Sequence, residues 1–331
     1  MTAKRDMATN IDQFMREQLL DRREKLEHAD LHLGGSERLR LLLQEVDSAL
    51  ERMESGCYGI CESCHDTIEC DRLMADPLVR FCLDHLTRHE RSALEQDLQL
   101  ASRVQTGLLP KGDLGRDGWQ ICYHYEPAGL VSGDYCDVIH AGENGLYFMV
   151  GDVSGKGVAA SMLMAHLHAM FRTLIPLGLS LPCMLQHASR VFRDSTLPNQ
   201  YATLVAARAW PDGRVEICNA GHPLPLVVRE GTVQAVENSN LPIGLFDSEE
   251  FALTEVLLAP GHGLVIYSDG VSEATDWLGR EYGADRIREL IRQKHTLNAS
   301  SLLAMCRDDL TEFRRNAAKA DDVTLFVLAR G

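Results

Sequence analysis

The sequence has no excess of positive charge, no long uncharged apolar run and none of the common nucleophile motifs. It carries 33 lysines and arginines against 48 aspartates and glutamates in 331 residues, a formal net charge of −15. A protein that binds the nucleic-acid backbone without sequence preference needs a basic face, so we expect no DNA partner. A phosphorylated protein remains compatible with this charge, because bound metal ions can reverse the local potential.

Two further absences concern membranes and covalent catalysis. No uncharged apolar run reaches the roughly 20 residues that span a bilayer, and the first six residues, Met1-Thr2-Ala3-Lys4-Arg5-Asp6, precede no apolar core. We therefore expect no signal peptide, no membrane partner and a cytoplasmic location. A P-loop, a Gly-x-Ser-x-Gly elbow and a Cys-x5-Arg loop are also missing from the sequence. A serine or cysteine nucleophile thus has little support.

The sequence does contain four short acidic motifs in its last two thirds. They are Ser132-Gly133-Asp134-Tyr135-Cys136-Asp137, Gly151-Asp152-Val153-Ser154-Gly155-Lys156-Gly157, Ser268-Asp269-Gly270 and Asp321-Asp322-Val323-Thr324. Two of them follow apolar runs typical of strands, and the last precedes one. Carboxylates at strand ends suit hard cations such as Mg²⁺ or Mn²⁺. Any single Asp-Gly pair could equally mark a hairpin turn, but four motifs in this order favour a metal site.

The residues of these motifs and their order along the chain resemble those of the metal-dependent type 2C protein phosphatases, and specifically of their bacterial SpoIIE/RsbU branch. The resemblance runs from about Trp119 to Ala329 and also includes Asn219-Ala220-Gly221-His222-Pro223 and Leu241-Pro242-Ile243-Gly244. It implies a protein serine/threonine phosphatase with two Mn²⁺ or Mg²⁺ ions. It also implies a small phosphorylated anti-sigma antagonist as the substrate.

The resemblance assigns roles to individual residues. It implies that four aspartates are catalytic metal ligands, together with the backbone carbonyl of Val153: Asp134, Asp152, Asp269 and Asp321. Asp152 would bridge both ions, and Asp137 would support the ligands without touching metal. Asp322 is the weaker candidate, because Asp321 holds the first position of the Asp-x-x-Thr motif. His166 and His168 could be ligands in principle, but packed or surface histidines fit a helix better, and His222 reads as structural or pocket-lining.

Two bound cations would serve a definite chemical purpose. Phosphate monoesters resist attack because their negative charge repels nucleophiles. Two ions about 3.5–4 Å apart can neutralise that charge, orient the ester and lower the pKa of a bound water. The sequence offers neither an arginine that we can match to a phosphate clamp nor an assignable general acid.

The pattern of apolar residues predicts an α+β fold. Strand-like runs lie at 120–125, 146–151, 202–209, 214–218, 224–228, 251–258, 263–267 and 323–329, with helical stretches near 158–175, 181–194, 283–293 and 299–316. Helices clustered between groups of strands favour this layering over a βαβ alternation. The resemblance implies two packed antiparallel sheets flanked by helices.

The N-terminal region holds a different pattern. Cys61-x2-Cys64-x17-Cys82-x2-His85 has the spacing of a tetrahedral zinc site, although the same cysteines could be buried free thiols. The surrounding sequence resembles the DksA/TraR zinc-finger family. The matching segments include Tyr58-Gly59-Ile60-Cys61-Glu62-Ser63-Cys64 and Arg72-Leu73-Met74-Ala75-Asp76-Pro77. That family usually has a cysteine where this chain has His85. We expect one structural Zn²⁺, preceded by a helical hairpin over residues 10–29 and 36–53 or by two helices of a generic bundle.

In that family the tip of the hairpin enters a channel of RNA polymerase and presents acidic residues. Here the tip, Asp30-Leu31-His32-Leu33-Gly34-Gly35, holds one acidic residue, and residues 51–92 carry five basic and nine acidic side chains. A sensory or dimerising role for the module is therefore favoured over RNA polymerase binding. The alternative reading is an RNA polymerase-binding regulator whose phosphatase domain is ancillary, and a third is an inactive scaffold.

A helical connector is predicted between the two regions. It carries a narrow apolar seam, as in a coiled coil, formed by Leu94, Leu98, Ala101, Val104 and Leu108. Leu100-Ala101-Ser102-Arg103-Val104-Gln105-x2-Leu108-Leu109-Pro110 resembles the segment that joins two subunits in the SpoIIE/RsbU branch. We favour a homodimer through this seam over a helix packed on its own domain. The predicted organisation is a zinc module over 1–92, a connector over 93–111 and a phosphatase domain over 112–331.

Overall fold

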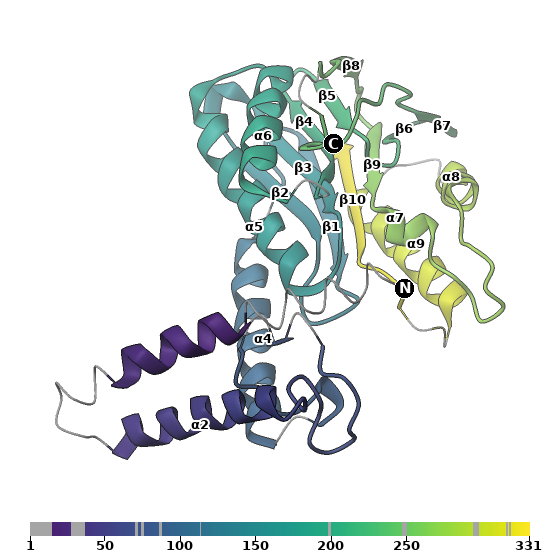
Figure 1. Cartoon of the computed structure of the whole chain (residues 1–331). Helices are drawn as coiled ribbons and strands as arrows, with labels where there is room; N and C mark the ends of the chain where they lie inside the picture. The colour runs from purple at the N-terminus through teal and green to yellow at the C-terminus, as the bar shows by residue number, and fades with distance from the viewer. Residues whose placement is uncertain are drawn as a thin grey trace. The chain divides into compact units, whose positions relative to one another are not determined.

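The computed structural model describes residues 15–27, 37–69, 72–73, 76–85, 88–112, 114–197, 200–246, 250–293, 298–315, 317 and 319–331. The chain divides into two compact units, Met1–Gln96 and Asp97–Gly331 (Figure 1). The boundary falls inside helix α4, which spans Arg88–Leu108. It therefore lies within the segment that the sequence predicts as a connector.

The smaller unit begins with two helical arms, residues 15–27 and α2 (Glu37–Glu54). They pack through Leu19, Val46 and Ala49, all of which are buried, and Arg23 pairs with Asp47 across the arms at 3.0 Å. The predicted helical hairpin is confirmed in these arms. The predicted tip, Asp30 to Gly35, lies outside the described residues. A zinc-finger-like loop with the short helix η1 (Leu83–His85) follows α2.

Two five-stranded antiparallel sheets form the larger unit. Their strand orders are β1-β10-β9-β6-β7 and β2-β3-β4-β5-β8. The strands are β1 (Trp119–Glu126), β2 (Asp134–His140), β3 (Leu146–Val153), β4 (Ala202–Ala209), β5 (Arg214–Ala220), β6 (Leu226–Arg229), β7 (Thr232–Ala235), β8 (Thr254–Leu257), β9 (Gly263–Tyr267) and β10 (Val323–Arg330). The helices are η2 (Gly142–Asn144), α5 (Gly157–Leu174), η3 (Ile175–Leu177), α6 (Leu181–Ser195), α7 (Asp269–Ser272), α8 (Ala284–Arg292) and α9 (Ala299–Arg314).

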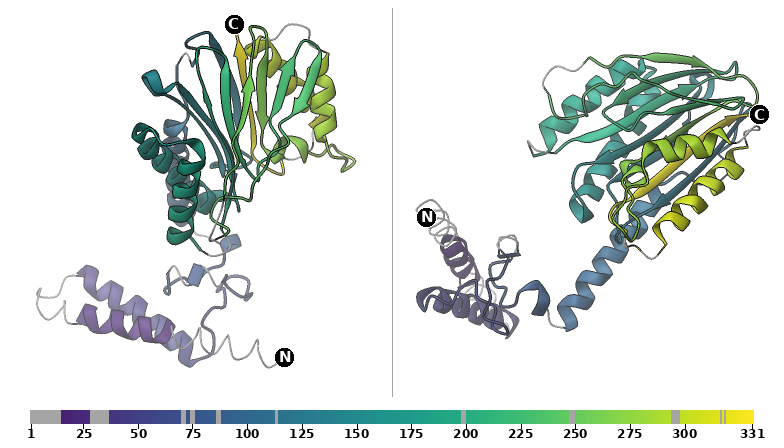
Figure 2. Two further views of the ribbon diagram at one scale, coloured as in Figure 1. Left: turned by 90° about the horizontal axis from the view of Figure 1, so that it is seen from above. Right: turned by 90° about the vertical axis from the view of Figure 1, so that its right-hand side faces the viewer.

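The two sheets pack face to face and are covered by helices on their outer faces (Figure 2). An apolar core fills the space between them, with Phe148 of β3 stacked on Phe326 of β10 at 5.2 Å between ring centres. A second core joins α5 and α6 to the sheet that contains β3, and a third joins α8 and α9 to the sheet that contains β10. The predicted α+β fold of two packed antiparallel sheets flanked by helices is confirmed.

Strand β2, strand β7 and helix α7 are among the elements that were not predicted from the sequence. Strand β2 was read only as an acidic motif, because aspartates are depleted from buried strands. Here Asp134 and Asp137 are both buried on β2 and both have hydrogen-bond partners, which offsets the cost of burying them. The four-residue elements β7 and α7 are too short to show a period, and β8 covers only the end of the predicted run 251–258.

One helix among the described residues, Gly157–Leu177, is long and apolar enough to span a membrane by length and composition alone. It contains α5 and η3, and its Met164, Leu167 and Phe171 lie in the core against the sheet. Arg172 in the same helix pairs with the buried Asp137. These contacts are those of a helix that packs on its own domain.

Candidate active site and metal centres

Asp134 and Asp152 lie opposite each other on the neighbouring strands β2 and β3. Asp134 is 1% exposed, and its Oδ2 accepts hydrogen bonds from Ser268 Oγ at 3.0 Å and Thr324 Oγ1 at 2.5 Å. Both donors belong to the other sheet or its adjoining loop, so this carboxylate joins the two sheets. Burial, together with the charge of Asp152, raises the pKa of Asp134 well above its usual value.

Asp152 lies at the end of β3 with its carboxylate partly buried. Burial and the charges of Asp269 and Asp321 raise its pKa to about 7. A carbonyl oxygen lies close by: a Cβ built on Gly133 would stand 3.1 Å from Asp152 Oδ1 and 3.0 Å from the carbonyl oxygen of Val153. The oxygens of Asp152 and Val153 therefore face the same small space, which the absence of a side chain at position 133 keeps open.

Asp269 and Asp321 are brought together by a close approach of two backbones. Asp269 begins α7 directly after β9, and a Cβ on the next residue, Gly270, would stand 1.9 Å from the carbonyl oxygen of Asp322. Only glycine fits there. Burial and the charge of Asp321 raise the pKa of Asp269. The ends of four strands, β2, β3, β9 and β10, thus deliver carboxylates to one end of the sandwich.

Asp321 and Asp322 have different surroundings although they are adjacent. The Asp322 carboxylate is buried and accepts backbone N–H groups from Ala128 at 2.7 Å and Gly133 at 2.8 Å. Its two oxygens therefore hold the loop before β2. The Asp321 side chain is 40% exposed and pairs with Lys156 Nζ at 2.9 Å. The charge of Asp321 raises the pKa values of Asp152 and Asp269, so its carboxylate lies near both of them.

The structure does not bring Asp137 to this cluster. It lies three positions after Asp134 on β2, so its side chain leaves the opposite face of the strand. Its carboxylate receives both Arg172 Nε at 2.9 Å and Arg172 Nη2 at 2.6 Å from α5, and His168 Nε2 lies 3.7 Å away. Asp137 therefore anchors α5 to the sheet instead of supporting the metal ligands from behind. His168 is part of the same contact between α5 and the sheet.

The other two histidines also have packing roles. His166 stacks on Phe192 of α6 at 6.1 Å between ring centres. His222 is buried, and its Nδ1 is 2.9 Å from Thr203 Oγ1. Burial lowers the pKa of His222 to about 3, so the ring is neutral at physiological pH.

Several residues around the cluster were missed in the sequence. Ser268 and Thr324 belong to two of the acidic motifs. Their hydroxyl groups are hydrogen-bond donors, which was the signal in the sequence that they could hold a carboxylate. Lys156 was also inside a motif, and it donates to the carbonyl of Ala320 at 2.7 Å as well as to Asp321. Gln105 of α4 gave no such signal: its amide donates to Ser132 O at 2.6 Å and accepts Ser132 N at 2.9 Å.

The aspartate cluster fits divalent cations by the chemistry of its donors. Carboxylate and carbonyl oxygens are the ligands that Mg²⁺ and Mn²⁺ prefer. Like charges held in a partly buried site disfavour their own ionised forms, as the raised pKa values of Asp134, Asp152 and Asp269 show. A cation bound among them would relieve this repulsion. We therefore regard the cluster as a candidate metal centre.

The four predicted zinc ligands of the smaller unit converge much more tightly. The ligand atoms of Cys61, Cys64, Cys82 and His85 all lie within 4.8 Å of one another. Cys64 Sγ and Cys82 Sγ are 3.7 Å apart, close to the edge of about 3.8 Å that a tetrahedron with ~2.3 Å Zn–S bonds requires. The loop is a tight turn in which Cys61 N donates to Asp66 O and His65 N donates to Cys61 O.

The surroundings of one of these thiols, that of Cys61, favour metal as well. Burial opposes ionisation of Cys61, but hydrogen bonds from the backbone of Cys64, Cys82 and Ser63 lower its pKa to about 6. A thiolate is the form that binds Zn²⁺. The geometry and the chemistry of these four residues together fit one tetrahedral zinc ion.

Comparisons with known structures define the class of the larger unit. It resembles the SiaA-PP2C domain of Pseudomonas aeruginosa, with a TM-score of 0.64 and 18% identity over 75% of this chain and 100% of that one. It also resembles the PP2C phosphatase domain of SpoIIE from Bacillus subtilis, with a TM-score of 0.57 and 19% identity over 64% of this chain and 63% of that one. The two sheets and their helices are therefore the PP2C fold.

The family follows from the sequence comparisons. Residues 142–331 match the family Stage II sporulation protein E (SpoIIE), and the chain belongs to this family. It is 24% identical to protein IcfG of Synechocystis over 71% of the chain and 27% identical to the phosphoserine phosphatase RsbP of Bacillus subtilis over 55%. These matches span 41% and 46% of the two relatives. It is also 24% identical to the phosphoserine phosphatase RsbU of Bacillus subtilis, over 75% of the chain and 74% of RsbU.

The smaller unit has relatives of another kind. The chain is 37% identical over 73 residues to the RNA polymerase-binding transcription factor DksA of Caulobacter vibrioides, which is 22% of this chain and 51% of that one. The sequence resemblance to the DksA/TraR zinc-finger family is thereby confirmed.

Proposed function

We propose that this protein is a metal-dependent protein serine/threonine phosphatase. One observation carries the proposal. Asp134, Asp152, Asp269 and Asp321 gather at one end of a PP2C-type sandwich, and burial and neighbouring charges raise the pKa values of the first three. The named activity of the relatives RsbP and RsbU supports it.

In the proposed site Asp134, Asp152, Asp269, Asp321 and the Val153 carbonyl would hold two Mn²⁺ or Mg²⁺ ions, and Asp152 would be the ligand that both ions share. When bound, the ions would supply charge neutralisation and a water of lowered pKa. Net hydrolysis would join the water oxygen to phosphorus, break the bond from phosphorus to the seryl or threonyl oxygen, and pass a proton from the water to that oxygen. Ser268 and Thr324 hold the Asp134 carboxylate in place through their hydroxyl groups.

The proposed substrate is a phosphorylated regulatory protein, such as an anti-sigma antagonist, met in the cytoplasm. The test is release of phosphate from phosphoserine, phosphothreonine and phosphotyrosine peptides in the presence of Mn²⁺. We expect release from the first two, loss of release with EDTA, and no release by Asp269→Asn. A phosphoproteome comparison of cells carrying the wild type or Asp269→Asn would then identify the substrate. Equal peptide turnover by Asp269→Asn would refute the proposed function.

We also propose that the connector controls this activity as part of a homodimer. Leu94 and Val104 of its seam are exposed and Leu98 is half-buried, while Leu108 packs on the core beside α5. The last turn therefore packs on its own domain, and the earlier turns offer apolar surface to a second chain. Gln105 links the helix to Ser132, two residues before Asp134. A shift of α4 would therefore move Ser132, and through it the proposed ligand Asp134.

A second function rests on the likeness of the smaller unit to DksA. On this reading the module binds RNA polymerase and the phosphatase domain is ancillary. The acidic tip motif is absent from the sequence, so we favour a sensory or dimerising module held by one zinc ion. An RNA polymerase pull-down with the wild type and Cys61→Ser distinguishes these: capture of polymerase by the wild type alone would favour the second function.

A further inference from the structure

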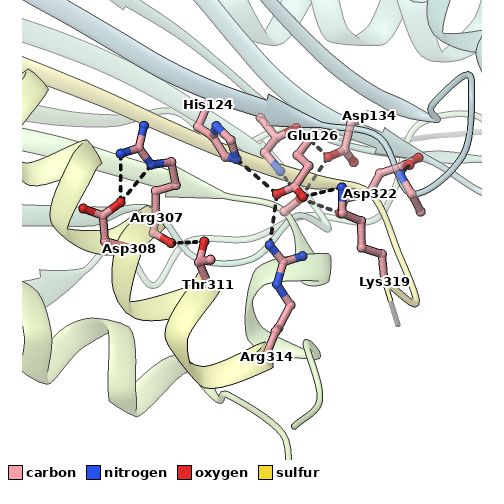
Figure 3. Close-up of polar contacts among 12 residues, drawn as sticks. His124, Glu126, Asp134, Arg307, Asp308, Thr311, Arg314, Lys319 and Asp322 are labelled. Atoms are coloured by element: carbon pink, nitrogen blue, oxygen red, sulfur yellow. Dashed lines mark hydrogen bonds and ion pairs between the residues drawn. The ribbon is translucent and has the colours of Figure 1, made fainter. Parts of the chain in front are cut away.

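A buried ion cluster ties down the segment that presents Asp321. This segment joins the end of α9 to the start of β10, and the structure describes its residues 315, 317 and 319–322. At its centre is Glu126, the last residue of β1 (Figure 3). Neither the proposed metal ligands nor the motifs of the sequence include this glutamate.

Three basic side chains meet the Glu126 carboxylate. Its Oε2 accepts from Arg314 Nη2 at 2.9 Å and lies 3.2 Å from His124 Nε2, while its Oε1 pairs with Lys319 Nζ. The Glu126 side chain is 22% exposed and that of Arg314 is 11% exposed. Burial opposes ionisation, but the three donors lower the pKa of Glu126 to about 2, so the carboxylate is charged at any working pH.

Two of the partners of Glu126 lie at opposite ends of the segment that presents Asp321. Arg314 ends α9 on one side of the segment, and Lys319 lies two residues before Asp321 on the other. Glu126 is also level with Val323, the first residue of β10, in the β1–β10 ladder. One carboxylate therefore fixes both ends of the segment against the frame of the sheet.

The backbone at the α9 end of the segment is bent. Arg315 has a φ of 46°, a left-handed conformation that is costly for a residue with a side chain. Ala317 N donates to Arg314 O at 2.8 Å, which closes the turn. Lys156 also contacts the other end of the segment, through Ala320 O and Asp321. A bent segment needs such anchors to keep one geometry.

An exposed ion pair contributes little to the positioning of a segment, because water screens the two charges. The pair between Arg307 and Asp308 on α9 is of that kind, with side chains 49% and 67% exposed. Glu126 differs because it is mostly buried, has three partners and ties two ends of one segment.

We propose that Glu126 is a positioning residue that sets the affinity of the aspartate cluster for divalent cations, by holding the Asp321 segment through Arg314 and Lys319. Glu126 touches neither substrate nor metal. The inference rests on the proposed function only in that it takes Asp321 as a ligand of the metal centre.

The test measures Mn²⁺ affinity of the full chain by electron paramagnetic resonance of the free ion, with phosphatase turnover and thermal unfolding on the same samples. Residues that orient metal ligands typically change affinity by about 10–100-fold, and we expect a weakening of this order in Glu126→Gln. Turnover should return close to wild type at saturating Mn²⁺. Asp308→Asn, which breaks the exposed pair on the same helix, is the matched control and should leave affinity unchanged.

Lys319→Gln provides a second variant that disturbs the fold less, since Lys319 is 45% exposed. The losses of Mn²⁺ affinity in Lys319→Gln and Glu126→Gln should not be additive in the double variant. Both substitutions break the same ion pair between Glu126 and Lys319. Unchanged Mn²⁺ affinity in both single variants would overturn the inference, whatever their melting temperatures. Weakened affinity in both, in a protein that shows no phosphatase turnover at all, would uphold the inference and reject the proposed function.

Discussion

Asp321 and Asp322 show how two identical side chains can have separate tasks. Asp322 uses both carboxylate oxygens to accept buried backbone N–H groups, whereas Asp321 pairs with Lys156 and lies near the carboxylates of Asp152 and Asp269. The sequence motif ranks Asp321 first by position alone. The contacts supply a physical reason for the same order, because oxygens that hold two backbone groups are less available to a cation.

We predict that Asp321→Asn and Asp322→Asn separate activity from stability. Asp321→Asn should lose most Mn²⁺-dependent turnover and keep its unfolding free energy within about 1 kcal/mol, since it breaks one surface pair. Asp322→Asn should retain much more turnover but lose about 1–3 kcal/mol, because one buried N–H loses its acceptor. Urea unfolding and turnover on both variants check this. The reverse ranking of turnover would show that Asp322 is the ligand.

His222 is a buried base that stays neutral in the folded protein. Its pKa is about 3 when folded, against an ordinary value of 6.5, so the unfolded chain binds the extra proton first as pH falls. Its contribution to stability is complete above pH 6.5 and is lost progressively towards pH 3.

We therefore predict that His222→Gln flattens the pH dependence of stability. Between about pH 6 and 4 the wild type should lose up to about 1.4 kcal/mol per pH unit more than the variant. Urea unfolding at pH 7, 6, 5 and 4 measures the difference between the two proteins, which removes the titration of shared carboxylates. Parallel curves for wild type and His222→Gln would show that the ring is protonated in the fold or freely solvated.

At the scale of elements, the zinc loop depends on very little apolar packing. Its core consists of Cys61, Ile68, Leu73 and Cys82, and two of these four are proposed ligands. A core of this size cannot offset the chain entropy of the loop. The free energy of metal binding would therefore stabilise the folded loop.

We predict one zinc ion per chain, lost together with the folded loop in Cys82→Ser. Elemental analysis of anaerobically purified protein should give one zinc in the wild type and none in the variant. Limited proteolysis should then cut the variant near residues 61–82. A wild type without zinc whose loop resists proteolysis would disprove the assignment.

The connector α4 is the second element with a testable role. Its seam is exposed at Leu94 and Val104, and its end is fastened to the domain by Gln105. If two chains pair through the seam, the helix can have two positions with different contacts, which is the condition for control of a distant site.

We predict that Leu98→Asp weakens dimerisation and changes metal-dependent turnover together. Leu100→Asp is the control, because Leu100 is exposed on the same helix but lies off the seam. Light scattering and turnover on the same samples decide the matter. A Leu98→Asp protein with unchanged mass and unchanged turnover would exclude this route of control.

The elements also show what the sequence could and could not predict. The apolar runs located most strands and the four longer helices of the catalytic domain, because period and length are local properties. Strand β2 was missed because its polar residues are satisfied from far away, Asp134 by Thr324 and Asp137 by Arg172. The anchors Gln105–Ser132 and Glu126–Lys319 were missed for the same reason, since spacing in one chain does not report tertiary pairs.

At the scale of the whole molecule, a chain with a net charge of −15 concentrates several of its carboxylates at one end of a sandwich. This arrangement is unfavourable for the protein alone and favourable for a protein that binds cations. It connects the fold, which delivers the strand ends, to the proposed hydrolysis of a phosphate ester.

The most direct test is hydrolysis of p-nitrophenyl phosphate by protein freed of divalent ions and then titrated with Mn²⁺ or Mg²⁺. We predict no turnover in the metal-free protein, saturable recovery with added ion, renewed loss with EDTA, and almost none at any ion concentration in a folded Asp152→Asn variant. Robust turnover by the rigorously metal-free wild type, or full turnover by Asp152→Asn, would contradict the account.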